Sequence, residues 1–234
     1  MKLHKIAAIA AVLAAGSAQA DVSLLDSSMY PTLVGTNGGT IAGVTFGTNA
    51  GKTFVQKTKS GISGLGVSGG RTGDEIDIDE TVGMGWAGGL VITSFSVGVL
   101  YNGPEFGDWA EIAKVTARNG NTVVGVGLLQ VDATNNTVAS FTGTGFGTVI
   151  NLSPATDDKG GGWTVLNPFG NAKVTSLHFT ALESTLCGTQ SRCTNQSDYT
   201  LSSVTAVPEP GTYAMFAAGL GALGFVARRR QRRD

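Results

Sequence analysis

The residues most able to do chemistry lie in one short acidic segment. Residues 73–80 read Gly-Asp-Glu-Ile-Asp-Ile-Asp-Glu. If this segment is a strand, its side chains alternate between two faces, and Glu75, Asp77 and Asp79 share one face at intervals of about 7 Å. Carboxylates this close repel one another unless a cation offsets their charge, and Ca²⁺ prefers such oxygen ligands. The segment therefore predicts a Ca²⁺ site whose candidate ligands are Glu75, Asp77, Asp79, Glu105 and Asp108.

The same segment has a second interpretation. A row of carboxylates also fits a solvated strand face that discourages pairing at a sheet edge. The Asp-x-Asp spacing lacks the glycine and the distal glutamate of a helix-loop-helix calcium site. The sequence therefore requires no cofactor, and Ca²⁺ is the one ion that it suggests.

Catalytic groups are scarce. Apart from His4 near the start of the chain, His178 is the sole histidine, and it lies in an alternating segment as a strand-surface residue would. The chain has no Gly-x-Ser-x-Gly segment, which a serine hydrolase would need. A glycosidase needs two facing carboxylates, and Glu75, Glu105 and Glu111 are available, but sequence spacing does not establish such a pair. We predict that the protein is not an enzyme.

The chain has two cysteines, Cys187 and Cys193, in a polar segment. In an oxidising compartment, two thiols this close in sequence are most simply a disulfide. Two thiols without a nearby histidine make a poor zinc site. The spacing predicts a Cys187–Cys193 disulfide, with free or metal-bound thiols as the alternative.

The elements that must position these residues are short strands. From Ile41 onward, segments rich in Val, Ile, Thr and Phe are separated by turn-forming residues. No segment has sustained apolar residues at helical spacing, which disfavours a parallel sheet with crossover helices. We predict an all-β domain, an antiparallel β-sandwich with jelly-roll-like topology. Its predicted strands are residues 41–46, 52–57, 62–67, 75–80, 90–101, 110–118, 122–131, 138–141, 163–166, 173–180 and 199–204.

Two smaller features refine this fold. Arg118-Asn119-Gly120-Asn121 predicts a tight hairpin turn, because Asn-Gly tolerates positive φ angles. Large aromatic residues dominate burial in small sandwiches, but they also form platforms on which sugar rings stack. The candidates for such a platform are Trp86, Trp109, Trp163 and Tyr101.

The N-terminal end of the chain has the pattern of an export signal. Its first residues are basic and precede an apolar run at residues 6–15. Ala18-Gln19-Ala20 then supplies the small-x-small pattern at which signal peptidase cleaves. We predict a helical signal peptide over residues 1–20, with Ala18, Ala20 and Asp21 forming the cleavage site; an uncleaved anchor is the alternative.

The C-terminal end combines three features in order. Pro208 and Pro210 keep the segment extended, since proline fixes its own φ and disfavours helix in the residue before it. Residues 211–227 carry no charge and are at the short end of what spans a bilayer as a helix. Arginines then hold that end on the cytoplasmic side of the membrane. These membrane-orienting residues are Arg228, Arg229, Arg230, Arg232 and Arg233.

This order resembles the PEP-CTERM sorting signal, and the sorting motif is formed by Val207, Pro208, Glu209, Pro210 and Gly211. The resemblance covers about an eighth of the chain. It implies export in Gram-negative, exopolysaccharide-making bacteria and processing by exosortase, a transpeptidase-like membrane enzyme. An ordinary C-terminal anchor, with Pro-Glu-Pro only as its linker, is the alternative.

The two ends define three parts: a signal peptide at 1–20, an exported domain at 21–206 and a sorting signal at 207–234. Of 16 basic residues, Lys2, Lys5 and the five tail arginines lie outside the exported domain, and of 17 acidic residues, Glu209 in the motif and Asp234 at the end do. The domain up to the motif is therefore clearly acidic, with 9 basic and 15 acidic residues, and counting Glu209 gives a net charge of about −7 for the exported part. Such a domain does not suit nucleic acid, because it offers no cationic face to phosphates.

The resemblance implies a non-catalytic exported protein of the cell envelope or extracellular matrix. Its expected partners are signal peptidase, exosortase, exopolysaccharide and, before processing, the inner membrane through the C-terminal helix. After processing, it would reside at the cell surface or in the matrix. The alternative is a secreted carbohydrate-binding or glycan-hydrolysing β-sandwich domain.

Overall fold

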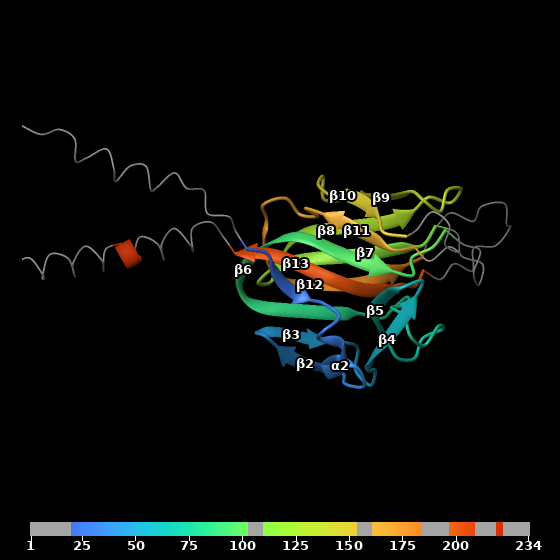
Figure 1. Cartoon of the computed structure of the whole chain (residues 1–234), viewed down its shortest axis with the longest axis horizontal. Helices are drawn as coiled ribbons and strands as arrows, with labels where there is room; N and C mark the ends of the chain where they lie inside the picture. Colours follow the sequence, from blue (N-terminus) through green and yellow to red (C-terminus); the bar gives the residue numbers. More distant parts are fainter. Residues whose placement is uncertain (1–19, 103–109, 154–160, 184–196, 209–218, 222–234) are drawn as a thin grey trace, which may run out of the picture. The chain divides into compact units, whose positions relative to one another are not determined.

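The computed structural model describes residues 20–102, 110–153, 161–183, 197–208 and 219–221 (Figure 1). Contacts divide the chain into two compact units. One unit is Asp21–Val207, and the other combines Met1–Ala20 with Pro208–Asp234. The division into a signal peptide, an exported domain and a sorting signal stays a prediction.

The described residues form thirteen strands and one short helix, α2 (Tyr30–Leu33). The strands are β1 (Val22–Leu25), β2 (Gly38–Ile41), β3 (Val44–Gly47), β4 (Phe54–Lys59), β5 (Ile62–Val67), β6 (Val82–Gly98), β7 (Ile112–Asn119), β8 (Thr122–Val131), β9 (Ala139–Thr142), β10 (Thr148–Asn151), β11 (Trp163–Leu166), β12 (Lys173–Leu182) and β13 (Thr200–Pro208). All pairings between these strands for which a register is defined are antiparallel. The prediction of an antiparallel all-β domain is confirmed, whereas jelly-roll-like topology stays a prediction.

Strand β6 joins two groups of strands into one hydrogen-bonded network. Its first half lies between β3 and β12, and β7, β8 and β9 continue from β12. Its second half pairs with β11 and is followed in the other direction by β13, β5 and β4. Figure 1 shows β6 as one long, strongly curved strand. The two groups therefore belong to one continuous sheet that turns a corner at the middle of β6.

The corner has a local cause in the sequence. Strands β6 and β12 are antiparallel, and Gly85 pairs with Ser176 while Leu90 pairs with Val174. Between these two pairs, β6 therefore has more residues than β12, which is a β-bulge. Gly88 within this bulge has φ +79°, a conformation that side chains other than glycine's disfavour. A bulge bends a strand and increases its twist, so these extra residues turn β6 from one group of strands to the other.

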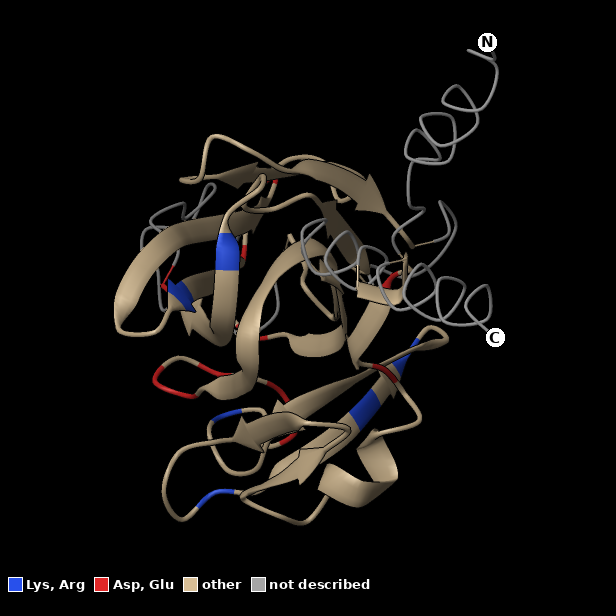
Figure 2. Cartoon of the chain, turned by 90° about the vertical axis from the view of Figure 1, so that its left-hand side faces the viewer, with Lys and Arg blue, Asp and Glu red and all other residues tan. Residues whose placement is uncertain are grey.

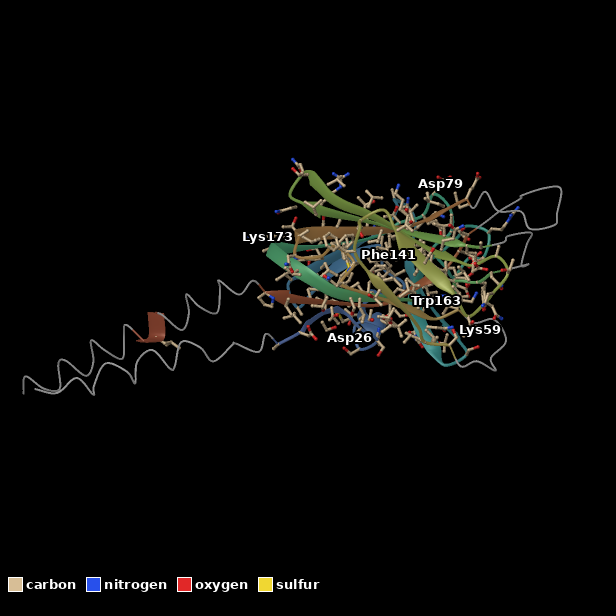
Figure 3. The ribbon with its side chains drawn as sticks, turned by 90° about the horizontal axis from the view of Figure 1, so that it is seen from above. Asp26, Lys59, Asp79, Phe141, Trp163 and Lys173 are labelled. Carbon is tan, nitrogen blue, oxygen red and sulfur yellow. The ribbon has the colours of Figure 1, made fainter. Side chains whose placement is uncertain are left out.

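One hydrophobic core fills the space that the strands enclose. Phe95 from β6 makes edge-to-face contacts with Phe141 of β9 and Phe179 of β12, at centroid distances of 5.8 and 5.5 Å. Trp163 is also fully buried, whereas Asp79 and Lys59 lie at the periphery of the domain (Figure 3). Aromatic side chains from distant strands therefore hold the domain together.

Several predicted strands agree with the structure. Residues 62–67, 122–131 and 163–166 match β5, β8 and β11 at both ends. Asn119 and Thr122 pair across the predicted hairpin, and Gly120 has φ +56°. The strand predicted at 75–80 is wrong, because these residues form no strand apart from one isolated bridge at Ile78. The sequence also failed to predict β1, β2, β10 and the first half of β6.

The helices predicted at the two ends fall almost entirely outside the described residues. Residues 1–19 and 222–234 are not described, and neither are 209–218. Residues 219–221 are helical. Within the part of the chain that the structure describes, no helix is both long enough and apolar enough to cross a membrane.

Candidate functional site

The acidic segment does not run as a strand but packs as irregular backbone beside β5. The amide of Val67 donates to the Glu75 carbonyl at 3.0 Å, and the amide of Ile76 donates to the Tyr199 carbonyl at 2.7 Å. A Cβ on Gly66 would lie 2.2 Å from the Asp74 carbonyl oxygen, so this close approach requires glycine. The segment therefore rests directly on the backbone of β5, with Ile76 fully buried.

Glu75 points into the domain and is only 2% exposed. Its Oε1 lies 3.0 Å from the Lys57 ammonium, and the same ammonium lies 3.0 Å from Asp74. Burial raises the pKa of Glu75, although Lys57 and a hydrogen bond with Asp198 oppose this rise. Burial also acts to lower the pKa of Lys57, but the interactions with Asp74 and Glu75 outweigh it and raise that pKa. Glu75 is thus part of an internal ion pair.

Asp77 and Glu80 are buried as well, and they hold the loop around them. The Asp77 carboxylate accepts hydrogen bonds from the backbone amides of Arg71 and Thr72, at 2.8 and 3.2 Å. Glu80 accepts from the Asp77 amide at 3.0 Å and pairs with Lys52. Burial raises the pKa of Glu80. These two carboxylates therefore stabilise the conformation of the loop that contains them.

Asp79 has a different orientation, because it is exposed and its φ is +68°. The prediction that Glu75, Asp77 and Asp79 share one strand face is therefore wrong. Among the described residues, no group of three His, Cys, Asp or Glu side chains could hold a metal ion. Glu105 and Asp108 lie outside the described residues, so calcium binding that involves them stays a prediction.

The aromatic residues considered for a sugar platform are, where described, buried or half-buried in the domain. Trp163 is buried and donates its indole N–H to the Leu100 carbonyl at 3.0 Å, and Tyr101 is also buried. Trp86 is half-buried and donates to the Val174 carbonyl at 3.0 Å. Trp109 lies outside the described residues. An exposed sugar platform that includes Trp163 and Tyr101 is therefore wrong.

Two further groups have contrasting settings. Glu111 is buried, and its carboxylate accepts a hydrogen bond from the Tyr101 amide. His178 is exposed on β12, where partial burial of its ring and the nearby Arg118 lower its pKa.

Cys187 and Cys193 lie outside the described residues, so their disulfide stays a prediction.

A groove that the sequence did not predict lies on the outer face of β3, β6 and β12. Its volume is about 420 Å³. The signal that could have identified it is the alternation of glycine with large apolar residues in Val82-Gly83-Met84-Gly85. Its lining residues are Thr45, Phe46, Gly47, Thr48, Asn49, Thr81, Gly83, Met84, Gly85, Ser176 and His178.

The two predicted processing points adjoin one pair of strands. Asp21 directly precedes β1, and β13 runs to Pro208 inside the Pro-Glu-Pro motif. These strands are antiparallel, and Val22 pairs with Ala206. The first residue expected after signal-peptidase cleavage and the start of the sorting motif therefore lie at the same end of the domain. Ala20 is exposed, whereas Ala18, Glu209, Pro210, Gly211 and the five tail arginines lie outside the described residues.

The last strand of this antiparallel all-β domain leads into a Pro-Glu-Pro segment that is followed by an apolar run and arginines. Residues 206–231 match the family model described as the PEP-CTERM protein-sorting motif. The chain therefore carries a PEP-CTERM protein-sorting motif at these residues, and the match implies exosortase as its processing partner and export toward the cell envelope. Comparison with curated proteins and with solved structures gave no match to either.

Proposed function

We propose that this protein is a non-catalytic component of the cell envelope or extracellular matrix that exosortase sorts and processes, and that it associates with exopolysaccharide. The observation that carries the proposal is the match of residues 206–231 to the sorting motif, which begins where the last strand of the domain ends. Within the domain, the buried carboxylates of Glu75, Asp77 and Glu80 pair with lysines and backbone amides.

The proposed route has two membrane steps. Signal peptidase cleaves after Ala20 and leaves Asp21 as the first residue of the exported protein. The apolar tail then holds the chain in the inner membrane, with the arginines on the cytoplasmic side, until exosortase acts near Pro208. The released domain resides at the cell surface or in the matrix.

Replacing Pro208, Glu209 and Pro210 by alanines tests this route. Hydrophobicity drives insertion of the tail, whereas the motif is recognised separately. We expect the variant to insert normally but to accumulate as the full-length membrane form, which immunoblotting of fractionated cells would reveal. The matched control is Ser23→Ala in β1, which changes the strand beside β13 and leaves the motif intact. Processing of the triple-alanine variant at the normal rate would refute the proposal.

A further inference from the structure

We propose that the groove formed by β3, β6 and β12 binds a neutral saccharide chain. This inference rests on the proposed association with exopolysaccharide, and it assigns that association to one site in the exported domain and to one class of saccharide. It also stands apart from the aromatic platform expected from the sequence, since it uses other residues.

The groove arises from the register of three neighbouring strands. On the outer face, Thr45 of β3, Gly85 of β6 and Ser176 of β12 form one cross-strand row. Gly47, Gly83 and His178 form the next outer row. Because β6 contributes only glycine to both rows, its backbone forms a floor between side chains on the flanking strands.

The floor is firmly supported from beneath. Phe46, Met84 and Leu177 form the row between the two outer rows, and none of the three is more than 3% exposed. Their side chains belong to the hydrophobic core. The groove is therefore a preformed feature of a packed sheet.

The two glycines of β6 are not required by the fold itself. A Cβ on Gly83 would meet its nearest atoms at 3.5 Å, and one on Gly85 would meet its nearest atom at 3.7 Å, which are ordinary contacts. Neither glycine has the positive φ that would exclude other residues. Glycine inside a strand weakens it and often marks a place where a ligand approaches the backbone closely. Gly83 and Gly85 therefore point to an occupant above β6.

The end of the groove at Thr48 and Asn49 is fixed by the fold. The hydroxyl oxygen of Thr48 is buried and has no hydrogen-bond partner among the described residues. The side chain of the neighbouring Asn49 is fixed, since its oxygen accepts from the Thr81 amide at 2.7 Å and its nitrogen donates to the Asp79 carbonyl at 3.1 Å. The Thr48 hydroxyl lies beneath the groove surface, so the polar groups that a ligand can reach are those of Thr45, Ser176 and His178.

The chemistry of the lining selects the ligand. None of the described residues that line the groove is an aspartate, glutamate, lysine or arginine, and Figure 2 shows charged residues only sparsely along the described ribbon. Thr45 and Ser176 offer hydroxyls, and His178 offers an imidazole whose lowered pKa keeps it neutral at pH 7. These groups can both donate and accept hydrogen bonds, as sugar hydroxyls require. The exposed glycine backbone accommodates the flat C–H face of a sugar ring.

The size of the groove fits a short length of chain. A volume of about 420 Å³ lies within the range of small-molecule sites, roughly 300–1,000 Å³. An acidic ligand would instead be drawn toward Arg118, which is the cross-strand partner of Ser176 on β7 and stands beside the groove. Neutral and acidic saccharides can therefore be distinguished by the residues on which their binding depends.

The test is calorimetric titration of the full chain with neutral oligosaccharides. Hexamers of β-1,3-glucose, β-1,4-glucose and α-1,6-mannose serve as probes, and the chain is kept in a detergent without a sugar headgroup so that the micelle does not compete. Gly85→Val fills the groove, and Ser176→Ala removes one of its hydroxyls. Gly39→Val is the matched control, because a Cβ at this strand glycine would meet nothing within 4 Å and Gly39 does not line the groove.

We expect at least one neutral hexamer to bind, with affinity at least tenfold weaker in Gly85→Val, several-fold weaker in Ser176→Ala and unchanged in Gly39→Val. No binding of any neutral probe at millimolar concentration would overturn the proposal. So would binding of uronate oligomers alone that is lost in Arg118→Ala but kept in Gly85→Val. Concentration-dependent association that Gly85→Val abolishes, without saccharide binding, would assign the groove to a second copy of the chain and overturn the proposal. Processing of the tail is expected to be normal in all these variants, so failure here is distinguishable from failure of the sorting proposal.

Discussion

The acidic segment at residues 74–80 and the groove on β3, β6 and β12 use polar groups in opposite ways. The segment holds the densest cluster of acidic residues in the sequence, yet Glu75, Asp77 and Glu80 are each no more than 3% exposed. The groove has no charged residue among its described lining, yet Ser176 and His178 reach its surface. In this domain, the concentrated charge organises the interior, and the accessible binding chemistry comes from neutral groups beside glycine.

The difference has an energetic basis. A carboxylate that leaves water loses hydration, and it is tolerated only where cations or amide donors replace the lost interactions. Lys57 and Lys52 supply the cations for Glu75 and Glu80, and backbone amides serve Asp77. Carboxylates already occupied in this way have little capacity left for an external ligand. The hydroxyls of Thr45 and Ser176 in the groove carry no charge and need no such counter-ion.

The largest effect is expected from a substitution at Gly66, the glycine on which the acidic segment packs. In Gly66→Ala, the new Cβ would lie 2.2 Å from the Asp74 carbonyl oxygen and 2.6 Å from the Glu75 Cα, so backbone must move. We expect the free energy of unfolding to fall by about 3 kcal/mol, the upper range for overpacking. Urea denaturation followed by tryptophan fluorescence measures this loss. Gly39→Ala, with open space around its Cβ, is the control, and equal stability of the two variants would contradict the packing described for the segment.

A smaller effect is expected from protonation of Glu75. Burial raises its folded-state pKa above the ordinary value of 4.5, so the folded protein binds this proton more tightly than the unfolded chain does. The resulting stability is fully present below pH 4.5 and is lost as pH rises through the folded-state pKa. We expect the stability difference between wild type and Glu75→Gln to shift in favour of Gln as pH rises from about 4 to about 7. Denaturation curves that differ by a constant amount over this range would show that Glu75 has no raised pKa.

Strands of β-rich composition that lie between clear turn residues could be predicted from the sequence. Thr122–Val131 and Ile62–Val67 have β-rich composition and clear turn residues at their ends, and both match the structure. The first half of β6 was missed, because its glycines resemble a loop. Pairing with β3 and β12 on both sides overrides that local preference. Such pairing between distant segments is not visible in a local pattern.

The candidate sites likewise differ in whether they depend on local sequence or on contacts between distant segments. The sorting motif could be predicted in full, because it is read as a linear segment and depends on no fold. The acidic segment was assigned the wrong structure, since alternation of Asp and Ile fits a strand as well as it fits a loop anchored by Ile76. What decided between them was the close packing on Gly66 and the position of Lys57 on β4, both tertiary features. The groove depends on three strands in register, so no single segment could reveal it.

The smallest expected stability change is the most informative about the groove. In Gly85→Val, the added Cβ would lie 3.7 Å from the nearest atom, which is an ordinary contact. Valine favours strands over glycine, by up to about 1 kcal/mol on host-protein scales. We therefore expect the free energy of unfolding to stay constant or rise by up to about 1 kcal/mol, while saccharide binding is lost. A protein that becomes more stable as it loses binding has kept glycine for the ligand. If Gly85→Val instead loses as much stability as Gly66→Ala, Gly85 serves the packing of the sheet, and the contrast between the two regions fails.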